Sequence, residues 1–438
     1  MRRRTAAGTG GPPVSGRHRP VAVLVGAPDE AVPAGPDQTV LAGPDQTVLA
    51  GRPVGHWLLD TLAQLDAEVV TDPPYPGDRP VLLIGAATPL IGAGTLARAV
   101  DRVTDDTDDT GDGRVVLLRA RRPAPWWDPT PPATTDAPAG LVLAGPVPLT
   151  VARLAGHLAG HLAAEVPCAV VRHQLVAAGV RVDDVTLHPT ESLRTTDPVE
   201  LAEARRAVQA RIVAGWQRRG VYVEDPATTS IDATVQLAPG VTVLAGTRLT
   251  GDTTVGAGSR IGPGVSLRDC RVGAHCEIRY AVCQDVDLGD RVNVGPYAWL
   301  RSRASLGDDC RAGAFVEIAD STVGAGTSVP HLAGLFSADV GRDCNLASMS
   351  GPANFNGGVK SRVRIGDGVA IGAGTILVAP VEVGDGAETA AGSVITDDVP
   401  SGALGMARTT QRNVTGWARL RRAAASAAGE AQRGGGHP

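Results

Sequence analysis

The stretch IGDGVAIGAGTILVAPVEVG, residues 365–384, places an aliphatic residue before glycine three times. From about residue 243 to residue 399 the chain advances in such hexads. The aliphatic-glycine pairs are Val255-Gly256, Ile261-Gly262, Val272-Gly273, Val294-Gly295, Leu306-Gly307, Val323-Gly324, Val340-Gly341, Ile365-Gly366, Ile371-Gly372 and Val383-Gly384. A fixed short period of this kind is typical of a β-helix, whose coils bury their aliphatic ladder only by stacking on each other. A six-residue period specifies the left-handed hexapeptide type, an exception to the usual right-handed crossover.

The hexads break in two places. The first break, at residues 332–339, directly follows Pro330 and His331. The second break, at residues 351–363, contains Asn354 and Lys360, the only lysine in 438 residues against 40 arginines. Binding and catalytic residues concentrate on irregular segments that a rigid scaffold positions. We therefore expect the chemistry of this chain at the two breaks.

The composition argues against several classes of partner. A net charge of −5 and a pI near 6.0 give no reason to expect nucleic acid or an anionic membrane. No apolar run is long enough to cross a membrane and no secretory segment is seen, so a cytoplasmic location is expected. No C-x-x-C pair occurs. We interpret the cysteines as small buried hydrophobic residues, and favour this over a zinc site or a disulfide framework. They are Cys168, Cys270, Cys276, Cys283, Cys310 and Cys344.

Short apolar runs alternate with helical patterns from residue 20 to residue 195, which predicts an α/β domain. The expected strands are residues 21–25, 81–84, 115–118 and 141–143, and the expected helices are residues 55–65, 94–103 and 151–164. Apolar residues at helical spacing predict one more helix at residues 199–219, joining the two domains. The acidic run at residues 104–113 lacks the closing glutamate of a calcium loop, and we interpret it as a solvated linker.

Five segments of the second half stand together as a signature. They are DPATTSID at residues 225–232, GPYAWLR at 295–301, GAFVE at 313–317, LVAPV at 377–381 and QRN at 411–413. In them the chain resembles the bifunctional bacterial family of N-acetylglucosamine-1-phosphate uridyltransferase/glucosamine-1-phosphate N-acetyltransferase. The resemblance is strong from about residue 197 onward and weak before it, where AGRPVGH at 50–56 and TPL at 88–90 remain.

The composition, the helical spacing and the resemblance together predict a division of the chain into five parts. A disordered segment at residues 1–19 precedes a degenerate nucleotidyltransferase-like, Rossmann-like α/β domain at 20–197. A linker helix at 198–222 leads into a left-handed parallel β-helix with acyltransferase function at 223–422. Residues 423–438 form a disordered tail.

Uridylyl transfer in this family uses a glycine-rich basic loop after the first strand and acidic ligands for Mg²⁺. Here the first strand runs into Gly26-Ala27-Pro28-Asp29-Glu30, where proline removes an amide and the acids repel phosphate. The family's metal-binding aspartate is replaced at Ala86-Ala87, and only Asp197 could still coordinate a metal. We expect no uridyltransferase activity, no resident metal and no Mg²⁺.

The coil domain keeps more of the family's site. By resemblance, His331 is the general base that takes a proton from the acceptor amine, which then attacks acetyl-CoA directly. Asn354 would orient the reacting groups by hydrogen bonds, and Asn345 would contact the acceptor. Ala391 and Arg408 match positions that line the coenzyme site, with Arg408 placed for a CoA phosphate. A solvated surface arginine is the alternative interpretation of Arg408.

The acceptor side departs from the family. Arg301 and Lys360 remain of the cations that gather round the sugar phosphate, but a second lysine is replaced by Ala319 and a tyrosine by Gly334. Each lost charge-assisted contact would cost about 1.5–3 kcal/mol. The family's coenzyme-contacting serine is Ala373. We therefore expect an acyl-CoA-dependent N-acetyltransferase. Its acceptor is expected to be another amino sugar or small amine, of the kind found in specialised metabolism. The replacement of the tyrosine by Gly334 is expected to leave open space for this acceptor.

Three alternatives stay open. The chain is a glucosamine-1-phosphate N-acetyltransferase of the usual kind, a non-catalytic scaffold or regulatory homologue, or a sugar-nucleotide transferase that uses Asp197. Acetyl-CoA as co-substrate and a homotrimer with sites between subunits are implied by resemblance only.

Overall fold

The computed structural model divides into two compact units, Met1–Asp285 and Val286–Pro438, which we call unit 1 and unit 2. The structure describes residues 21–25, 48–50, 52–53, 57, 61–65, 68–69, 81–85, 91–104, 114–119, 138–144, 168–177, 179–191, 198–355 and 357–434. The segments 1–19, 26–30, 86–87 and 151–164, and Asp197, therefore lie outside the described residues.

Unit 1 begins with a six-stranded mixed sheet of order β4-β1-β5-β7-β6-β8. Its strands are β1 (Val21–Val25), β4 (Glu68–Val69), β5 (Val81–Gly85), β6 (Arg114–Arg119), β7 (Pro138–Ala144) and β8 (Arg181–Thr186). Strand β7 is antiparallel to β5 and β6, and the other pairs are parallel. A separate ribbon pairs β2 (Val48–Leu49) with β3 (Arg52–Pro53). The α/β prediction and its four strands are confirmed.

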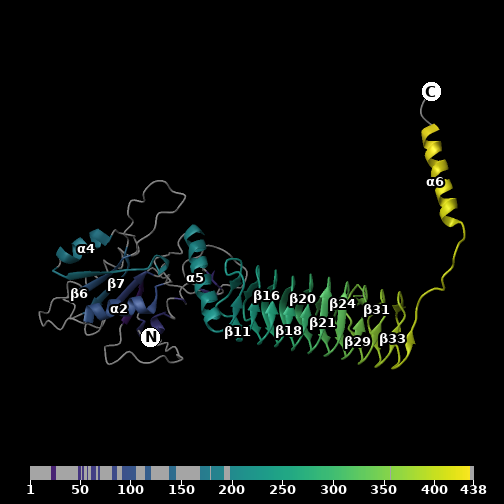
Figure 1. The fold of residues 1–438 in the computed structure, drawn as a ribbon, viewed down its shortest axis with the longest axis horizontal. Helices are drawn as coiled ribbons and strands as arrows, with labels where there is room; N and C mark the ends of the chain where they lie inside the picture. The colour runs from purple at the N-terminus through teal and green to yellow at the C-terminus, as the bar shows by residue number, and fades with distance from the viewer. Residues whose placement is uncertain are drawn as a thin grey trace. The chain divides into compact units, whose positions relative to one another are not determined.

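Helix α2 (Ala93–Thr104) packs against β6 and β7, and α4 (Cys168–Ala177) packs against β8 (Figure 1). The first turn of α2 is capped by Glu191, from the short 3₁₀ helix η1 (Pro189–Glu191). Its Oε1 accepts hydrogen bonds from the Gly92 amide at 2.8 Å and the Thr95 hydroxyl at 2.9 Å. A carboxylate suits this place because the amides at a helix N-terminus carry partial positive charge.

Helix α5 (Pro198–Arg218) covers the first coil of the β-helix. Leu201, Ala204 and Val208 on one face of it form a buried cluster. The Gln209 side chain forms two hydrogen bonds with the backbone of Ile231. Gln209 Nε2 donates to the Ile231 carbonyl at 3.0 Å, and the Ile231 backbone amide donates to Gln209 Oε1 at 2.9 Å. An amide side chain thus stands in for a missing neighbouring strand, which protects the open end of the coil from pairing with another chain.

The rest of unit 1 consists of parallel coils. One sheet runs β9-β12-β15-β17, another runs β10-β13-β16, and β11 pairs with β14, which pairs with β16. The strands are β9 (Tyr222–Val223), β10 (Ser230–Ile231), β11 (Gln236–Leu237), β12 (Thr242–Val243), β13 (Arg248–Thr250), β14 (Thr254–Val255), β15 (Arg260–Ile261), β16 (Ser266–Val272) and β17 (Glu277–Ile278). Strand β18 (Val282–Leu288) spans the division between the units.

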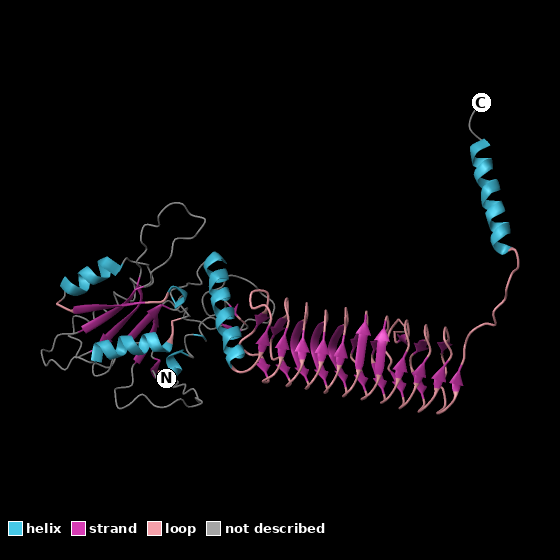
Figure 2. Ribbon diagram, in the orientation of Figure 1, coloured by secondary structure: helices cyan, strands magenta, loops and turns pink. Residues whose placement is uncertain are grey.

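Unit 2 also consists of stacked parallel coils (Figure 2), and its strands form three columns. The first column is β19 (Asn293–Val294), β21 (Arg311–Ala314), β24 (Ser328–His331), β27 (Asn345–Leu346), β30 (Ala370–Ile371), β33 (Glu388–Thr389) and β35 (Leu404–Gly405). The second is β20 (Trp299–Leu306), β23 (Thr322–Val323), β26 (Ala338–Val340), β29 (Val363–Ile365) and β32 (Val381–Val383). The third holds β22 (Glu317–Ala319), β25 (Gly334–Phe336), β28 (Gly351–Ala353), β31 (Ile376–Val378) and β34 (Val394–Ile395). The predicted left-handed parallel β-helix is confirmed.

The coil interior explains the sequence pattern. Aliphatic residues that end the hexads are buried, for example Val294, Val323 and Ile371. The glycines after Val323 and Ile371 have no space for a side chain: a Cβ on Gly324 would lie 2.6 Å from the carbonyl of Gly341 in the next coil, and a Cβ on Gly372 would clash with the Thr389 carbonyl oxygen. Cysteines of the coils are buried, as predicted, and burial raises the pKa of the Cys310 and Cys344 thiols. These residues hold the coils together and present the outward side chains at fixed intervals.

The two breaks differ in structure. Across the first break the coil continues through β25 and β26, and Leu335 and Ala338 are buried in the places of the aliphatic residues. The second break is a hairpin-like excursion, in which Phe355 and Lys360 form an antiparallel bridge and the Ser361 amide donates to the Asn354 carbonyl at 2.8 Å. Only the second break leaves the coil.

The C-terminal segment differs from the prediction. Residues 423–438 are expected to be disordered, but α6 (Trp417–Gly434) extends to Gly434. The segment is rich in alanine and arginine, which have high helix propensity. Within the residues that the structure describes, no helix is both long and apolar enough to cross a membrane.

Candidate functional site

His331 is the last residue of β24 and its side chain is exposed. The register of the first column, continued past the ends of its short strands, aligns His331 with Ser348, then Ala373, then Ala391 on successive coils. Neighbouring coils lie about 4.8 Å apart, so Ala373 is about 10 Å and Ala391 about 14 Å from His331 along the column. The proposed base and two proposed coenzyme positions therefore stand in one line, which we call the His331 column.

The coenzyme end of the column is joined by hydrogen bonds. The Gly392 amide donates to the Ala373 carbonyl at 2.8 Å, and Arg408 Nη1 donates to the Ala391 carbonyl at 3.3 Å. Arg408 is exposed and follows β35. The structure thus brings together the three residues that the sequence assigned to the coenzyme, Ala373, Ala391 and Arg408.

Ser348 is a member of the column that the sequence reasoning missed. It lies between His331 and Ala373, and its side chain is partly exposed. Its carbonyl accepts the Gly374 amide at 2.9 Å. A position count in steps of one coil from His331 would have found it. Asn345, predicted to contact the acceptor, pairs with Ser328 at the start of the same two strands and is exposed.

A second row of residues lies around the corner from His331. Register pairs Arg301 of β20 with Ala319 of β22 and then with Phe336 of β25. Asn354 Nδ2 donates to the Phe336 carbonyl at 3.1 Å, which fixes the asparagine side chain at the end of this row. The predicted acceptor-binding residue Arg301 and the predicted catalytic residue Asn354 therefore lie on one face, which we call the acceptor face.

The charge of Arg301 is already engaged. Its Nη2 and Nε donate to Glu317 Oε1 at 2.7 and 3.0 Å. Its guanidinium carbon lies 4.5 Å from the centre of the Trp299 ring, a cation–π contact. Arg301 and Glu317 are 35% and 31% exposed, so the pair is only partly screened by water.

The expected room beside Gly334 is not present. A Cβ placed on Gly334 would lie 2.7 Å from Cε2 and 3.0 Å from Cζ of Phe336. The two residues are two positions apart on β25, so both point to the same face of the strand. The prediction of an open space is wrong, because the Phe336 ring lies over the glycine.

Another cluster of paired charges borders the acceptor face. Arg362 donates to Asp339 Oδ1 at 2.6 Å and to Asp320 Oδ2 at 3.2 Å, and the Ser337 hydroxyl also donates to Asp320. Arg303 lies 3.7 Å from Asp320. Hydrogen bonds from Arg362 lower the pKa of Asp339, and those same bonds raise the pKa of Arg362. Lys360, in contrast, is exposed on the hairpin, and its ammonium forms no ion pair within the described part of the chain.

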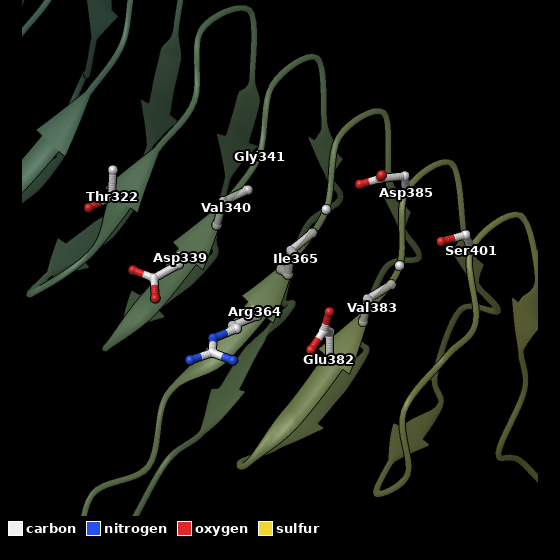
Figure 3. Close-up of a pocket in the computed structure, with 12 residues that line it drawn as sticks. Thr322, Asp339, Val340, Gly341, Arg364, Ile365, Glu382, Val383, Asp385 and Ser401 are labelled. Carbon is white, nitrogen blue, oxygen red and sulfur yellow. The ribbon is translucent and has the colours of Figure 1, made fainter.

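A groove of about 520 Å³ lies elsewhere on unit 2, over β23, β26, β29 and β32 (Figure 3). Register aligns Asp339, Arg364 and Glu382 along it, and Figure 3 shows these side chains on successive strands. Alternating charges on neighbouring strands stabilise the stacking of coils. None of the predicted site residues lines the groove. We therefore assign it no part in the site.

The described residues contain no group of three or more histidine, cysteine or acidic side chains that could hold a metal ion.

Comparison with known proteins finds sequence similarity to transferases with hexapeptide repeats. Residues 362–397 match the family model described as "Bacterial transferase hexapeptide (six repeats)". The bifunctional protein GlmU of Clavibacter sepedonicus is 42% identical over 226 residues, covering 52% of this chain and 46% of that protein. GlmU of Streptomyces coelicolor is 44% identical over 234 residues, covering 53% and 48%. The chain spans about half the length of the curated relatives it matches. The resemblance inferred from the sequence motifs is confirmed over that part.

Similarity to solved structures is lower. The UDP-N-acetylglucosamine acyltransferase of Francisella novicida gives a TM-score of 0.31 at 13% identity, covering 46% of this chain and 73% of that one. LpxA of Acinetobacter baumannii gives 0.30 at 16% identity, covering 46% and 77%. At these values neither structure carries an argument about the site.

Proposed function

We propose that this protein transfers an acetyl group, or another acyl group, from acyl-CoA to the nitrogen of an amine other than glucosamine-1-phosphate. The observation that carries the proposal is the His331 column, in which a histidine is aligned with the Ala373, Ala391 and Arg408 group over about 14 Å. An extended pantetheine chain fits such a line, with the thioester at His331 and the phosphates at Arg408.

The reaction needs a base at one end of the column. His331 takes a proton from the acceptor ammonium or amine, and the nitrogen lone pair attacks the thioester carbonyl. The carbon–sulfur bond then breaks, and the CoA thiolate leaves and is protonated. Imidazole suits the first step because it exchanges protons near neutral pH. We propose that Asn354, whose Nδ2 donates to the Phe336 carbonyl, donates its remaining amide hydrogen to the reacting groups.

The acceptor face supports the change of acceptor. A sugar phosphate would need free cations, but Arg301 is bonded to Glu317, and Ala319 offers no charge. Lys360 on the hairpin supplies one cation, and Asn345 an amide. We assign no uridylyl transfer and no Mg²⁺ to this chain, on the sequence of the loop at 26–30.

Assembly into a homotrimer with sites between subunits is part of the proposal. Tyr297, Phe315, Leu332 and Met349 are between 52% and 64% exposed, and all have positive φ. Large side chains with positive φ cost about 1–3 kcal/mol of strain at each position. An exposed apolar row of this kind usually marks an interaction surface. A second copy of the chain covering this row would compensate for the strain.

The proposal is tested by measuring CoA release from acetyl-CoA with a panel of amines, for the wild type and for His331→Ala. We expect release with at least one amine, and a loss of at least about 100-fold for His331→Ala. A rate with every amine no greater than that of His331→Ala would favour the scaffold interpretation. Rapid acetylation of glucosamine-1-phosphate with micromolar affinity would instead support an enzyme of the usual kind.

A further inference from the structure

The acceptor face combines apolar side chains with charges that are paired internally. Its strands β20, β22 and β25 present Trp299, Arg301, Glu317 and Phe336, while Ala319 between them is only 5% exposed. Register places Trp299 beside Glu317 and then Gly334, and Ala319 beside Phe336. The face begins three residues after His331, across a corner at Leu332, so a group bound there lies within reach of the base.

Six charged side chains of the coils border this face and pair with one another, whereas Lys360 lies on the neighbouring hairpin with no ion pair among the described residues. Glu317 neutralises Arg301, while Arg362 and Arg303 neutralise Asp320 and Asp339. The six charges sum to zero. A phosphate dianion would have to displace Glu317 from Arg301 and give up water against the Trp299 and Phe336 rings, with nothing gained from Ala319.

The same face favours the binding of an apolar ring. The Phe336 ring covers Gly334 and has no hydroxyl, so it offers surface without a polar requirement. Trp299, two coils away on the same face, is 47% exposed, and one face of its ring is engaged by Arg301. Aromatic and alicyclic rings bind to such surfaces by releasing water and by stacking.

We propose that the acceptor is a phosphate-free amine that carries an aromatic or alicyclic ring, which packs on Phe336 and Trp299 while its amino group reaches His331. The inference rests on the proposed acyl transfer and names the class of acceptor for the same site. Phe336 is then the residue that determines specificity, because its ring occupies the surface of Gly334.

The kinetic test compares benzylamine, glucosamine and glucosamine-1-phosphate as acceptors by CoA release. We expect the highest kcat/KM with benzylamine. The variant Phe336→Ala should lose about tenfold or more with benzylamine and change little with glucosamine, since the apolar area is lost only to the ring. Phe336→Leu, which keeps an apolar side chain, should lose less, and it guards against a misfolded alanine variant. The matched control is Tyr222→Ala, an exposed aromatic residue of unit 1.

Two results would overturn the inference while leaving acyl transfer intact. One is a higher kcat/KM with glucosamine-1-phosphate than with benzylamine, and the other is an equal loss with all three amines in Phe336→Ala. Calorimetric titration with benzylamine addresses the outcome in which no amine releases CoA. If no amine releases CoA, the proposed function fails, but binding of benzylamine that Phe336→Ala weakens would still support the acceptor class. Absence of such binding would overturn the acceptor class as well.

Discussion

Replacing Glu317 by glutamine tests whether the Arg301–Glu317 pair excludes phosphate. Glutamine keeps the shape and one acceptor oxygen but removes the charge that neutralises Arg301. A charge-assisted hydrogen bond contributes about 1.5–3 kcal/mol when shielded from water, and exposed ion pairs contribute about 0–1 kcal/mol. Both partners are about one third exposed, so a value of about 1–2 kcal/mol is appropriate here.

In the wild type, glucosamine-1-phosphate has to break the Arg301–Glu317 pair in order to bind. In Glu317→Gln this free energy no longer opposes binding. Since 1.4 kcal/mol corresponds to tenfold, the Kd for glucosamine-1-phosphate should fall by about 5- to 30-fold in Glu317→Gln. The free energy of unfolding should drop by less than about 1 kcal/mol, because glutamine retains one hydrogen bond. Titration calorimetry measures the first quantity, and denaturant unfolding measures the second.

Glu382→Gln is the matched control, because Glu382 is exposed on β32 and the change in net charge is the same. If both variants alter the Kd equally, the effect is one of overall charge, not of the pair. If Glu317→Gln leaves the Kd within twofold of the wild type, the pair does not limit phosphate binding, and the reasoning about the acceptor face is refuted.

The remaining predictions concern stability. Gln209→Ala should lower the free energy of unfolding by about 1–3 kcal/mol and increase aggregation, since both backbone groups of Ile231 lose their partner; urea unfolding and light scattering measure this. Glu191→Ala should cost about 0.5–2 kcal/mol by removing the cap of α2, read from the same unfolding curves. Arg362 lowers the pKa of Asp339, so this carboxylate adds stability above its unfolded pKa of about 3.9, and that stability is lost as pH falls through the lower folded value. Thermal melts from pH 6 to pH 2.5 should therefore fall less steeply in Arg362→Met, and an unchanged slope would contradict the assignment.

The coil could be predicted because its rule is local. An aliphatic residue and a small residue in each hexad satisfy the interior and the close approach of neighbouring coils, wherever the hexad stands. The same local rule predicted a break at residues 332–339, because the hexad motif is lost there. Ala338 is buried where an aliphatic residue is expected, so the coil continues although the motif is lost.

The α/β domain was predicted less completely. Strand β8 and helix α4 were missed, because β8 carries two consecutive aspartates, Asp183 and Asp184, and α4 has a weakly one-sided apolar pattern. What makes β8 a strand is its parallel pairing with β6, a contact more than sixty residues away in the sequence. Pairing over such a separation leaves little trace in local composition.

The acceptor face was misjudged because a position-by-position comparison treats each residue separately. Gly334 was taken as empty space, but the ring that covers it comes from Phe336. Side chains two apart on a strand share one face, so a loss at one position can be filled from the other. The pairing of Arg301 with Glu317 was missed in the same way, since it joins two coils.

The ammonium of Lys360 differs from the nearby arginines in having no ion pair within the described residues. The arginines bordering the acceptor face are each bonded to a carboxylate from another coil, and a planar guanidinium with several donors favours such fixed pairs. An ammonium is a compact charge on a flexible stem, which can follow a ligand that moves during the reaction. Lys360 stands on the hairpin, the segment of unit 2 that leaves the coil, and not on the rigid ladder. The coil therefore supplies a neutral, preorganised surface, while the hairpin supplies a cation that is not committed to a partner within the described residues.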